Sequence, residues 1–209
     1  LLPSLEFVLK SCGVTADEID LFACTVGPGS FTGVRIGAAT VKGMAFGKNK
    51  PCVGVSTLEA LAANARAFDG IICPCMNARR EQVYNALFMC KEGKLTRLCE
   101  DRALAIEDLL RELETYTPDH KIYLVGDGAE LVIDFDELGE RFPALDDRLI
   151  LLEERLRNQS GYSVAQVALE TYRNGISCTD AELAPVYLRP SQAERVRLEN
   201  EKKADGANV

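Results

Sequence analysis

The chain has 209 residues, of which 47% are hydrophobic and 27% are charged, and its formal net charge is −8. This balance is typical of one or two compact domains. Apolar stretches fall far short of the roughly 18 residues of a membrane-spanning helix, so we expect a soluble, cytoplasmic protein. Because an acidic chain repels a phosphate backbone, we do not expect it to bind nucleic acid tightly by itself.

The first part of the chain alternates helical patterns with short apolar runs. The predicted elements, in order, are a helix at 1–13, a capping box from Thr15 to Glu18, a strand at 21–26, a helix at 34–47, a strand at 52–55, a helix at 57–68 capped by Ser56 and Glu59, and a strand at 71–76. This alternation predicts an α/β fold with a partly parallel sheet.

The pattern changes after residue 76, and we expect a boundary between two lobes near residues 70–78. The later predicted elements are a hairpin-like pair over 83–104 with its turn at 91–94, an amphipathic helix at 106–114, strands at 121–125 and 147–152, a helix at 160–175, an extended segment at 184–190 and a frayed, charged tail. The expected divisions are residues 1–70, 71–183 and 184–209, with the last segment returning to the first lobe.

A glycine-rich stretch, TVGPGSFTGVRIG at residues 25–37, joins the first strand to the next helix. It lacks the lysine and the spacing of a phosphate-binding P-loop, and it is one residue too long for the dinucleotide fingerprint. One interpretation is a looser anion site at the start of the helix, formed by Gly27, Gly29, Ser30, Thr32, Gly33 and Arg35. The other is structural: a tight turn that passes close to other backbone needs glycine.

The helix that follows carries one charge and several small residues. Arg35 lies in its first turn, where a positive charge is unfavourable, so we expect it to reach an anion or a carboxylate. The small residues are Gly33, Gly37, Ala38, Ala39, Gly43, Ala45 and Gly47. They allow close packing either on the chain's own sheet or on another subunit, and the sequence leaves both open.

Residues for catalysis are sparse. His120 is the only histidine, which excludes a metal site built on two histidines. The eight cysteines lie mostly in apolar runs and are expected as small buried side chains in a reducing compartment, with Cys73 and Cys75 on one face of a strand. Residues 77–81 follow a buried strand and are a candidate cleft lining.

Four motifs occur in order: GPGSFTGVRIG, GVSTLEAL (54–61), NARREQVY (77–84) and APVYLR (184–189). In these the chain resembles the bacterial TsaB (YeaZ) family. The resemblance implies two related lobes of the actin-like ATPase fold, with a first lobe that lacks the family's N-terminal strands here and so exposes a sheet edge. The family often has Asp where this chain has Asn77, which puts an anionic role there in doubt.

The resemblance also implies a function. The family binds and activates its paralogue TsaD, together with the ATPase TsaE, in making threonylcarbamoyladenosine beside the tRNA anticodon, and it forms homodimers alone. Thr57 and Leu61 align with the metal-binding histidines of TsaD, so no metal, no catalysis and only indirect tRNA contact are expected. No cofactor is expected, although a nucleotide at the partner interface is left open.

The partner face is expected on helix 1–12 and on the predicted helix at 34–47, through Leu5, Leu9, Arg35, Ala38, Ala39, Lys42 and Ala45. The alternative function is an ATP-binding phosphotransferase or ATPase of the actin-like fold, with the glycine-rich stretch on the nucleotide.

Overall fold

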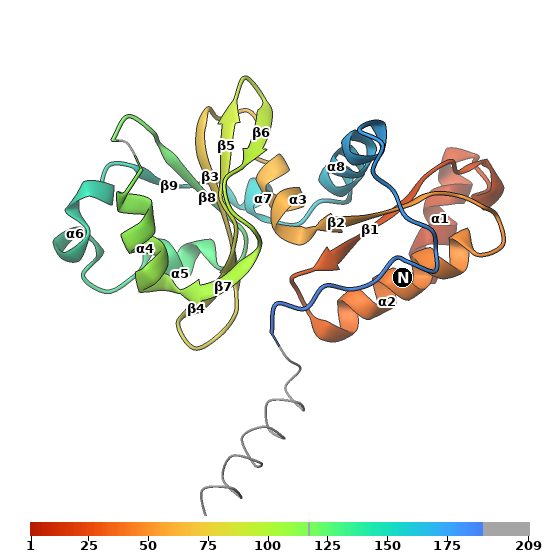
Figure 1. Cartoon of the computed structure of the whole chain (residues 1–209), viewed down its shortest axis with the longest axis horizontal. Coiled ribbons are helices and arrows are strands. Elements are labelled where there is room, and N and C mark those ends of the chain that lie inside the picture. The colour runs from red at the N-terminus through yellow and green to blue at the C-terminus, as the bar shows by residue number, and fades with distance from the viewer. Residues whose placement is uncertain (117, 190–209) are drawn as a thin grey trace, which may run out of the picture.

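The computed structural model describes residues 1–116 and 118–189, which form two α/β lobes joined through helix α3 (Figure 1). The first lobe consists of α1 (Leu2–Cys12), η1 (Ala16–Glu18), β1 (Phe22–Gly27), α2 (Phe31–Ala45), β2 (Cys52–Ser56) and α8 (Gly161–Arg173), with α3 (Thr57–Ala63) between the lobes. The second lobe consists of β3 (Gly70–Asn77), β4 (Gln82–Asn85), β5 (Phe88–Lys91), β6 (Lys94–Arg97), β7 (Arg102–Ala105), α4 (Ile106–Glu114), β8 (Ile122–Val125), α5 (Ala129–Ile133), α6 (Leu138–Arg141), η2 (Pro143–Leu145), β9 (Leu149–Leu151) and α7 (Glu154–Arg157). Among the described helices, none is both long and apolar enough to cross a membrane.

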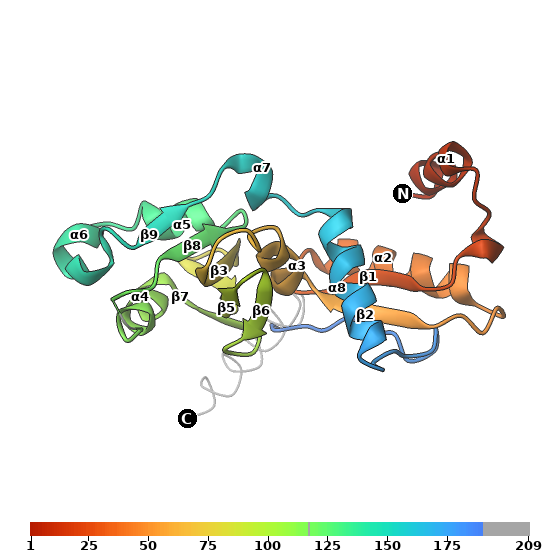
Figure 2. The same ribbon diagram turned by 90° about the horizontal axis from the view of Figure 1, so that it is seen from above.

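The first-lobe sheet pairs β1 and β2 in parallel, and helices cover both of its faces. Phe22 and Cys52 pack with Ala45 of α2 on one face. Val53 packs with Val167 of α8 on the other face, where α8 lies across the two strands (Figure 2). Burial on both faces explains why these strands appear in the sequence as continuous apolar runs, without alternation.

Helix α2 begins three residues earlier than its predicted start at residue 34. Ser30 is the N-cap, and its Oγ accepts a hydrogen bond from the N–H of Gly33 at 3.3 Å. A serine at this position satisfies one of the orphan N–H groups of a helix start. Thr32, Gly33 and Arg35 therefore belong to the helix and not to the preceding turn.

The predicted pair over 83–104 is one hairpin whose two arms are interrupted. The arm formed by β4 and β5 pairs antiparallel with the arm formed by β7 and β6. The break in the first arm lies after Asn85, whose buried side-chain amide donates to the carbonyls of Pro74 and Ala86 at 3.0 Å each. These bonds hold both halves of the arm along one edge of β3, whose other edge pairs in parallel with β8.

Helix α4 confirms the amphipathic pattern predicted at 106–114. Ile106, Leu109, Leu110 and Leu113 are buried in the main cluster of the second lobe, with Ile71 and Ile122 from the sheet. Helix α3 is shorter than predicted, because it ends at Ala63 and turns follow to residue 67. The predicted tail beyond residue 189 lies outside the described residues.

The expected division of the chain into 1–70, 71–183 and 184–209 remains a prediction, to which the structure adds one fact. Helix α8 comes late in the chain but packs on β1, β2 and α3, beside the first-lobe sheet (Figures 1 and 2). The segment 184–189 then returns along the first lobe, where the N–H of Val186 donates to the carbonyl of Val26 at 2.7 Å. The second sheet begins at Gly70, close to the expected boundary.

All eight cysteines are within the described residues and are free thiols. Cys73 and Cys75 share one face of β3, as predicted, with their Sγ atoms 3.6 Å apart. Both are fully buried, and the hydrogen bond between Cys73 and Cys75 together with burial raises the pKa of Cys73 well above its ordinary value. A buried neutral thiol of this kind is inert.

Candidate functional site

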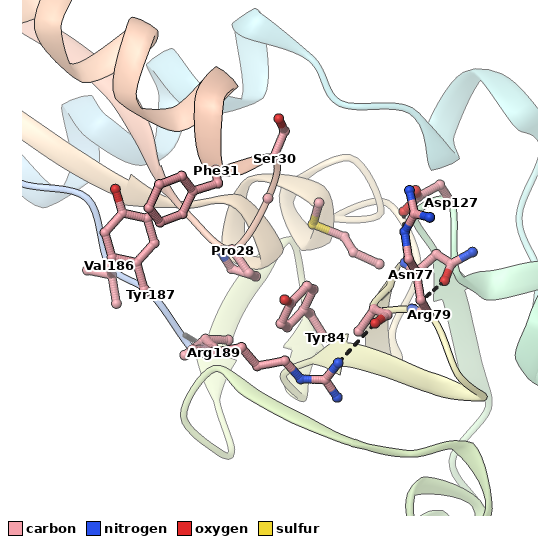
Figure 3. Close-up of a pocket in the computed structure, with 14 residues that line it drawn as sticks. Pro28, Ser30, Phe31, Asn77, Arg79, Tyr84, Asp127, Val186, Tyr187 and Arg189 are labelled. Atoms are coloured by element: carbon pink, nitrogen blue, oxygen red, sulfur yellow. Dashed lines mark hydrogen bonds between the residues drawn. The ribbon is translucent and has the colours of Figure 1, made fainter. Parts of the chain in front are cut away.

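Three of the four sequence motifs converge on one pocket between the lobes (Figure 3). Its cavity of about 370 Å³ falls in the range of small-molecule sites. Its lining residues are Pro28, Gly29, Ser30, Phe31, Met76, Asn77, Ala78, Arg79, Tyr84, Asp127, Val186, Tyr187, Leu188 and Arg189. Segments separated by up to 161 positions in sequence, from Pro28 to Arg189, thus meet where the carboxyl end of β1, the carboxyl end of β3 and the returning segment 184–189 approach each other.

Gly27 is required by the close approach of the returning segment. Its φ is 131°, and a Cβ built on it would lie 2.4 Å from the carbonyl oxygen of Val186. No L side chain fits both constraints. The structural interpretation of the glycine-rich stretch is therefore confirmed at Gly27.

Only part of the predicted anion loop lines the pocket. Gly29 and Ser30 do so, followed by Phe31 at the start of α2. Gly27, Thr32, Gly33 and Arg35 are not among the lining residues. The first N–H groups of α2 lack intrahelical acceptors and carry the positive end of the helix dipole at this wall of the pocket.

Within the described residues Arg35 contacts aromatic groups and forms no ion pair with a carboxylate, so the expected carboxylate partner is not found there, while an anion partner stays a prediction. Its Nε donates to the hydroxyl of Tyr187 at 2.7 Å, and its guanidinium carbon lies 3.9 Å from the centre of the Phe31 ring. The rings of Phe31 and Tyr187 are stacked with centroids 4.7 Å apart. Arg35 thereby fixes the returning segment to α2, next to the pocket.

The second-lobe wall contains a turn with unusual backbone geometry. Arg79, Arg80 and Glu81 have φ values of 63°, 55° and 56°, which L residues adopt rarely. The side-chain oxygen of Asn77 accepts from the N–H of Arg79 at 2.8 Å, and Asp127 accepts from the N–H of Asn77 at 3.2 Å. Asn77, Ala78 and Arg79 line this pocket and Arg80 and Glu81 do not, so the expected cleft lining at 77–81 is found here for its first three residues.

Tyr84, Asp127 and Arg189 are site residues that the sequence reasoning did not select. Arg189 donates to the carbonyl of Ala78 at 2.9 Å and to the side-chain oxygen of Gln82, and it lies over the ring of Tyr84. A signal existed for Asp127, because it follows β8, which is parallel to β3. The carboxyl ends of adjacent parallel strands are where α/β sheets bind ligands.

The fourth motif, GVSTLEAL, lies at the junction of the lobes. Ser56 at the end of β2 donates from Oγ to Asp101 at 2.5 Å, and Arg97 bridges Asp101 and Glu59 at 2.7 and 3.0 Å. Thr57 and Leu61 in α3 are 2% and 1% exposed. Within residues 1–116 and 118–189, no three His, Cys, Asp or Glu side chains cluster so as to hold a metal.

The predicted partner-facing residues divide into two groups. Ala38 and Ala45 are 3% and 1% exposed, and Lys42 donates to the carbonyls of Ala181 and Leu183 at 3.0 Å each. These three serve the packing of α2 within its own lobe, which corrects their assignment to an outer face. Ala39 is exposed, whereas Leu5 and Leu9 are half-buried in a groove of about 340 Å³ between α1, β1 and α2.

The chain is similar in sequence to known proteins of one family. The model of the family described as "TsaD: tRNA N6-adenosine threonylcarbamoyltransferase" matches residues 1–196. The tRNA threonylcarbamoyladenosine biosynthesis protein TsaB of Escherichia coli is 27% identical over 195 residues, covering 92% of this chain and 80% of that protein. The corresponding protein of Bacillus subtilis is 39% identical over 113 residues, so the match spans 54% of this chain but only 49% of that relative.

A solved structure shows the same fold. The crystal structure of an uncharacterized protein from Pseudomonas aeruginosa with similarity to peptidase YEAZ superposes with a TM-score of 0.74 and 26% identity, covering 90% of this chain and 82% of that one. The structure of YeaZ from the same organism gives a TM-score of 0.69. With the family match, this likeness confirms the predicted actin-like ATPase type of fold.

Proposed function

This chain belongs to the family of TsaD, the tRNA N6-adenosine threonylcarbamoyltransferase, and is similar within it to the TsaB (YeaZ) proteins, and from that membership we propose that it acts in the biosynthesis of threonylcarbamoyladenosine in tRNA. Its role there is that of a non-catalytic partner which binds and activates TsaD. TsaE acts with the pair, and the acidic chain reaches tRNA only through TsaD.

The observation that supports a partner role is the outer face of α2. Ile36 and Phe46 are 51% and 76% exposed, and exposed Ala39 and Gly43 lie between them at helical spacing. A Cβ on Gly43 would meet nothing within 4 Å. Two large apolar side chains around a small, open centre can receive a helix of another protein at close range. We call Ile36, Ala39, Gly43 and Phe46 the α2 outer face.

Helix α1 extends the apolar surface. It has no buried residue, and Leu1, Leu2, Phe7 and Val8 are all more than half exposed. Its inner side lines the same groove as Val41 and Met44 of α2. The two helices together offer TsaD a surface for helix packing, and a second copy of this chain would compete for that surface when TsaD is absent.

The residues at the start of α3 support a non-catalytic role. By the family resemblance, Thr57 and Leu61 are expected at the positions of the metal-binding histidines of TsaD. Neither a hydroxyl nor an isobutyl group replaces an imidazole as a ligand. Catalysis is therefore assigned to TsaD, and this chain supplies a surface.

Light scattering of mixtures with the cognate TsaD tests the proposed surface. We expect the double substitution Ile36→Glu and Phe46→Glu to abolish the complex, because it buries two carboxylates in an apolar contact. Leu169→Glu is the matched control, since Leu169 is a similarly exposed apolar residue on α8 and should leave assembly unchanged. Undiminished assembly of the double variant would contradict the proposal.

A further inference from the structure

Three of the eight cysteines gather in one apolar cluster of the first lobe. Cys52 of β2 is buried in this cluster with Ala45 of α2, and Cys24 of β1 and Cys178, in the segment after α8, pack against it. All three are free thiols. None of them lines the pocket between the lobes, so their chemistry is separate from that site.

Cys52 and Cys178 form a directly opposed antiparallel pair. The N–H of Cys52 donates to the carbonyl of Cys178 at 2.8 Å, and the N–H of Cys178 donates to the carbonyl of Cys52 at 2.9 Å. The Cα atoms of such a hydrogen-bonded pair are about 5.5 Å apart, within the range of about 4.4–6.8 Å that a disulfide spans. The Sγ atom of Cys178 lies 3.4 Å from the carbonyl oxygen of Cys52, so this thiol already lies over the backbone of its neighbour.

Cys24 belongs to the cluster but is not placed to join either of the other two. In the parallel pair of β1 and β2 it lies opposite Gly54, two positions from Cys52. Strand spacing and rise put the Cα atoms of Cys24 and Cys52 about 8 Å apart, too far for a disulfide. Cys178 pairs with the other edge of β2, so that strand lies between Cys178 and Cys24. The backbone therefore selects one pair among the three thiols.

The selected pair lies where the chain begins its return toward the lobe junction. Residues 178–183 lead from the pair to the returning segment 184–189, and Lys42 of α2 donates to the carbonyls of Ala181 and Leu183 at 3.0 Å each. Cys52 and Cys178 are 126 positions apart in sequence. A covalent bond between them would tie β2 permanently to the segment that follows α8.

We propose that Cys52 and Cys178 form a reversible disulfide when the chain meets a low-molecular-weight disulfide such as oxidised glutathione, and that this bond locks the segment after α8 to β2. The thiolate of Cys178, which is partly exposed, attacks oxidised glutathione, forms a mixed disulfide and releases one glutathione thiolate. The thiolate of Cys52 then attacks the sulfur of Cys178 and releases the second. The two protein thiols lose two protons and two electrons, which the two glutathione sulfurs gain.

This bond forms slowly and is easily reduced. Burial raises the pKa of both Cys52 and Cys178, so little thiolate is present near neutral pH. Directly opposed residues have Cβ atoms about 4.5–5.5 Å apart, whereas a disulfide needs about 3.5–4.5 Å, so the two segments must move slightly closer. Strain of this kind makes a disulfide labile, which suits a switch better than a permanent cross-link.

Peptide mapping by mass spectrometry without reductant tests the pair after the full chain is incubated with oxidised glutathione. We expect a peptide that links Cys52 to Cys178 and disappears with dithiothreitol. We also expect a Tm higher than that of the reduced chain by roughly 5 °C or more, because the bond closes a long loop of the unfolded chain. A link from Cys178 to Cys24, or glutathione that stays on Cys178 without a link to Cys52, would overturn the proposal.

Two substitutions separate the pair from the rest of the cluster. Cys178→Ser should abolish both the linked peptide and the rise in Tm, and it is chosen because Cys178 is partly exposed, whereas Cys52 is fully buried. Cys24→Ala is the matched control, which removes a thiol of the same cluster and should keep both effects. A rise in Tm that survives Cys178→Ser, or its loss in a Cys24→Ala variant that folds by circular dichroism, would contradict the assignment. The test uses the chain alone and does not depend on the role proposed with TsaD.

Discussion

At the scale of single residues, Gly27 shows how one position joins the two ends of the chain. The residue lies where β1 ends, and the carbonyl of Val186 approaches it so closely that no Cβ can be inserted. The neighbouring Val26 accepts the N–H of Val186, and Arg35 binds Tyr187. The site therefore depends on contacts between residues 26–35 and 186–187. Gly27 is a residue in these contacts at which no side chain can be added.

Gly27→Ala should lower the free energy of unfolding by about 2 kcal/mol or more, since it combines an unfavourable φ with a backbone clash. Urea denaturation monitored by circular dichroism measures the change. The control is Gly37→Ala in the middle of α2, where a Cβ would meet nothing within 4 Å. That substitution should stabilise the chain by roughly 0.5–1 kcal/mol through helix propensity. Equal effects of both would contradict the role given to Gly27.

The thiols make a second prediction at this scale. Burial raises the pKa of Cys24 to about 11, so at pH 8 only about one molecule in a thousand carries the reactive thiolate there. Cys12, at the end of α1, is the exposed cysteine. The native chain should therefore take up one maleimide rapidly, and Cys12→Ser should abolish the rapid phase. Rapid labelling that survives Cys12→Ser would show that the first lobe is more open than described.

At the scale of elements, the ion pair between Arg66 and Glu170 joins α8 to the segment after α3. Two hydrogen bonds of 2.5 and 2.6 Å connect the two side chains. The hydrogen bonds from Arg66 lower the pKa of Glu170 below its ordinary value. A carboxyl whose pKa is lowered by folding stabilises the native state above its unfolded pKa and loses that effect as the pH falls through its folded pKa.

Glu170→Gln should accordingly destabilise the chain at pH 7 by about 0.5–1 kcal/mol, a modest value because Glu170 is half exposed. The difference from the unsubstituted chain should shrink as the pH falls below the ordinary pKa of a glutamate, and it should vanish once the pH is below the lowered folded pKa, where Glu170 is protonated in both states. Urea denaturation at pH 7 and pH 3 tests this. Glu6→Gln, in a fully exposed pair with Lys10, should change neither value. A pH-independent loss at Glu170 would contradict the ion-pair explanation.

Elements with strong local signals were predictable from the sequence. The apolar periodicity of α4 and the capping serine and bounding glycine of α8 placed both helices within two residues of their observed ends. The early start of α2 was missed because its N-cap, Ser30, lies inside a glycine-rich stretch that resembles a loop. The breaks in the β4–β7 hairpin were missed because they depend on the buried amide of Asn85, whose partners lie on β3.

At the scale of the whole molecule, two lobes meet along α3 and are tied together by the returning segment 184–189 (Figure 1). Arg189 fixes this segment to the second lobe, while Val186 and Tyr187 fix it to the first. The pocket exists only because these long-range contacts form. For that reason its motifs were visible in the sequence, but Tyr84 and Arg189 could not be assigned to it from local patterns.

The α2 outer face and the pocket are separate parts of the surface. The α2 outer face lies on the solvent side of the first lobe, whereas the pocket opens between the lobes at the other end of the same helix. Composition alone could not separate the inward residues Ala38, Lys42 and Ala45 from the outward residue Ala39, because all four are suited to close packing. Which side of α2 faces a partner depends on which side of the helix packs on the first-lobe sheet.

The most direct test of the central claim is the rate at which TsaD and TsaE form threonylcarbamoyladenosine on tRNA as this chain is added. We predict a saturable increase with the unsubstituted chain and with Leu169→Glu, and little or no increase with Ile36→Glu and Phe46→Glu combined. A rate that does not depend on the chain, or equal stimulation by the double variant, would contradict the proposal that this protein activates TsaD through the α2 outer face.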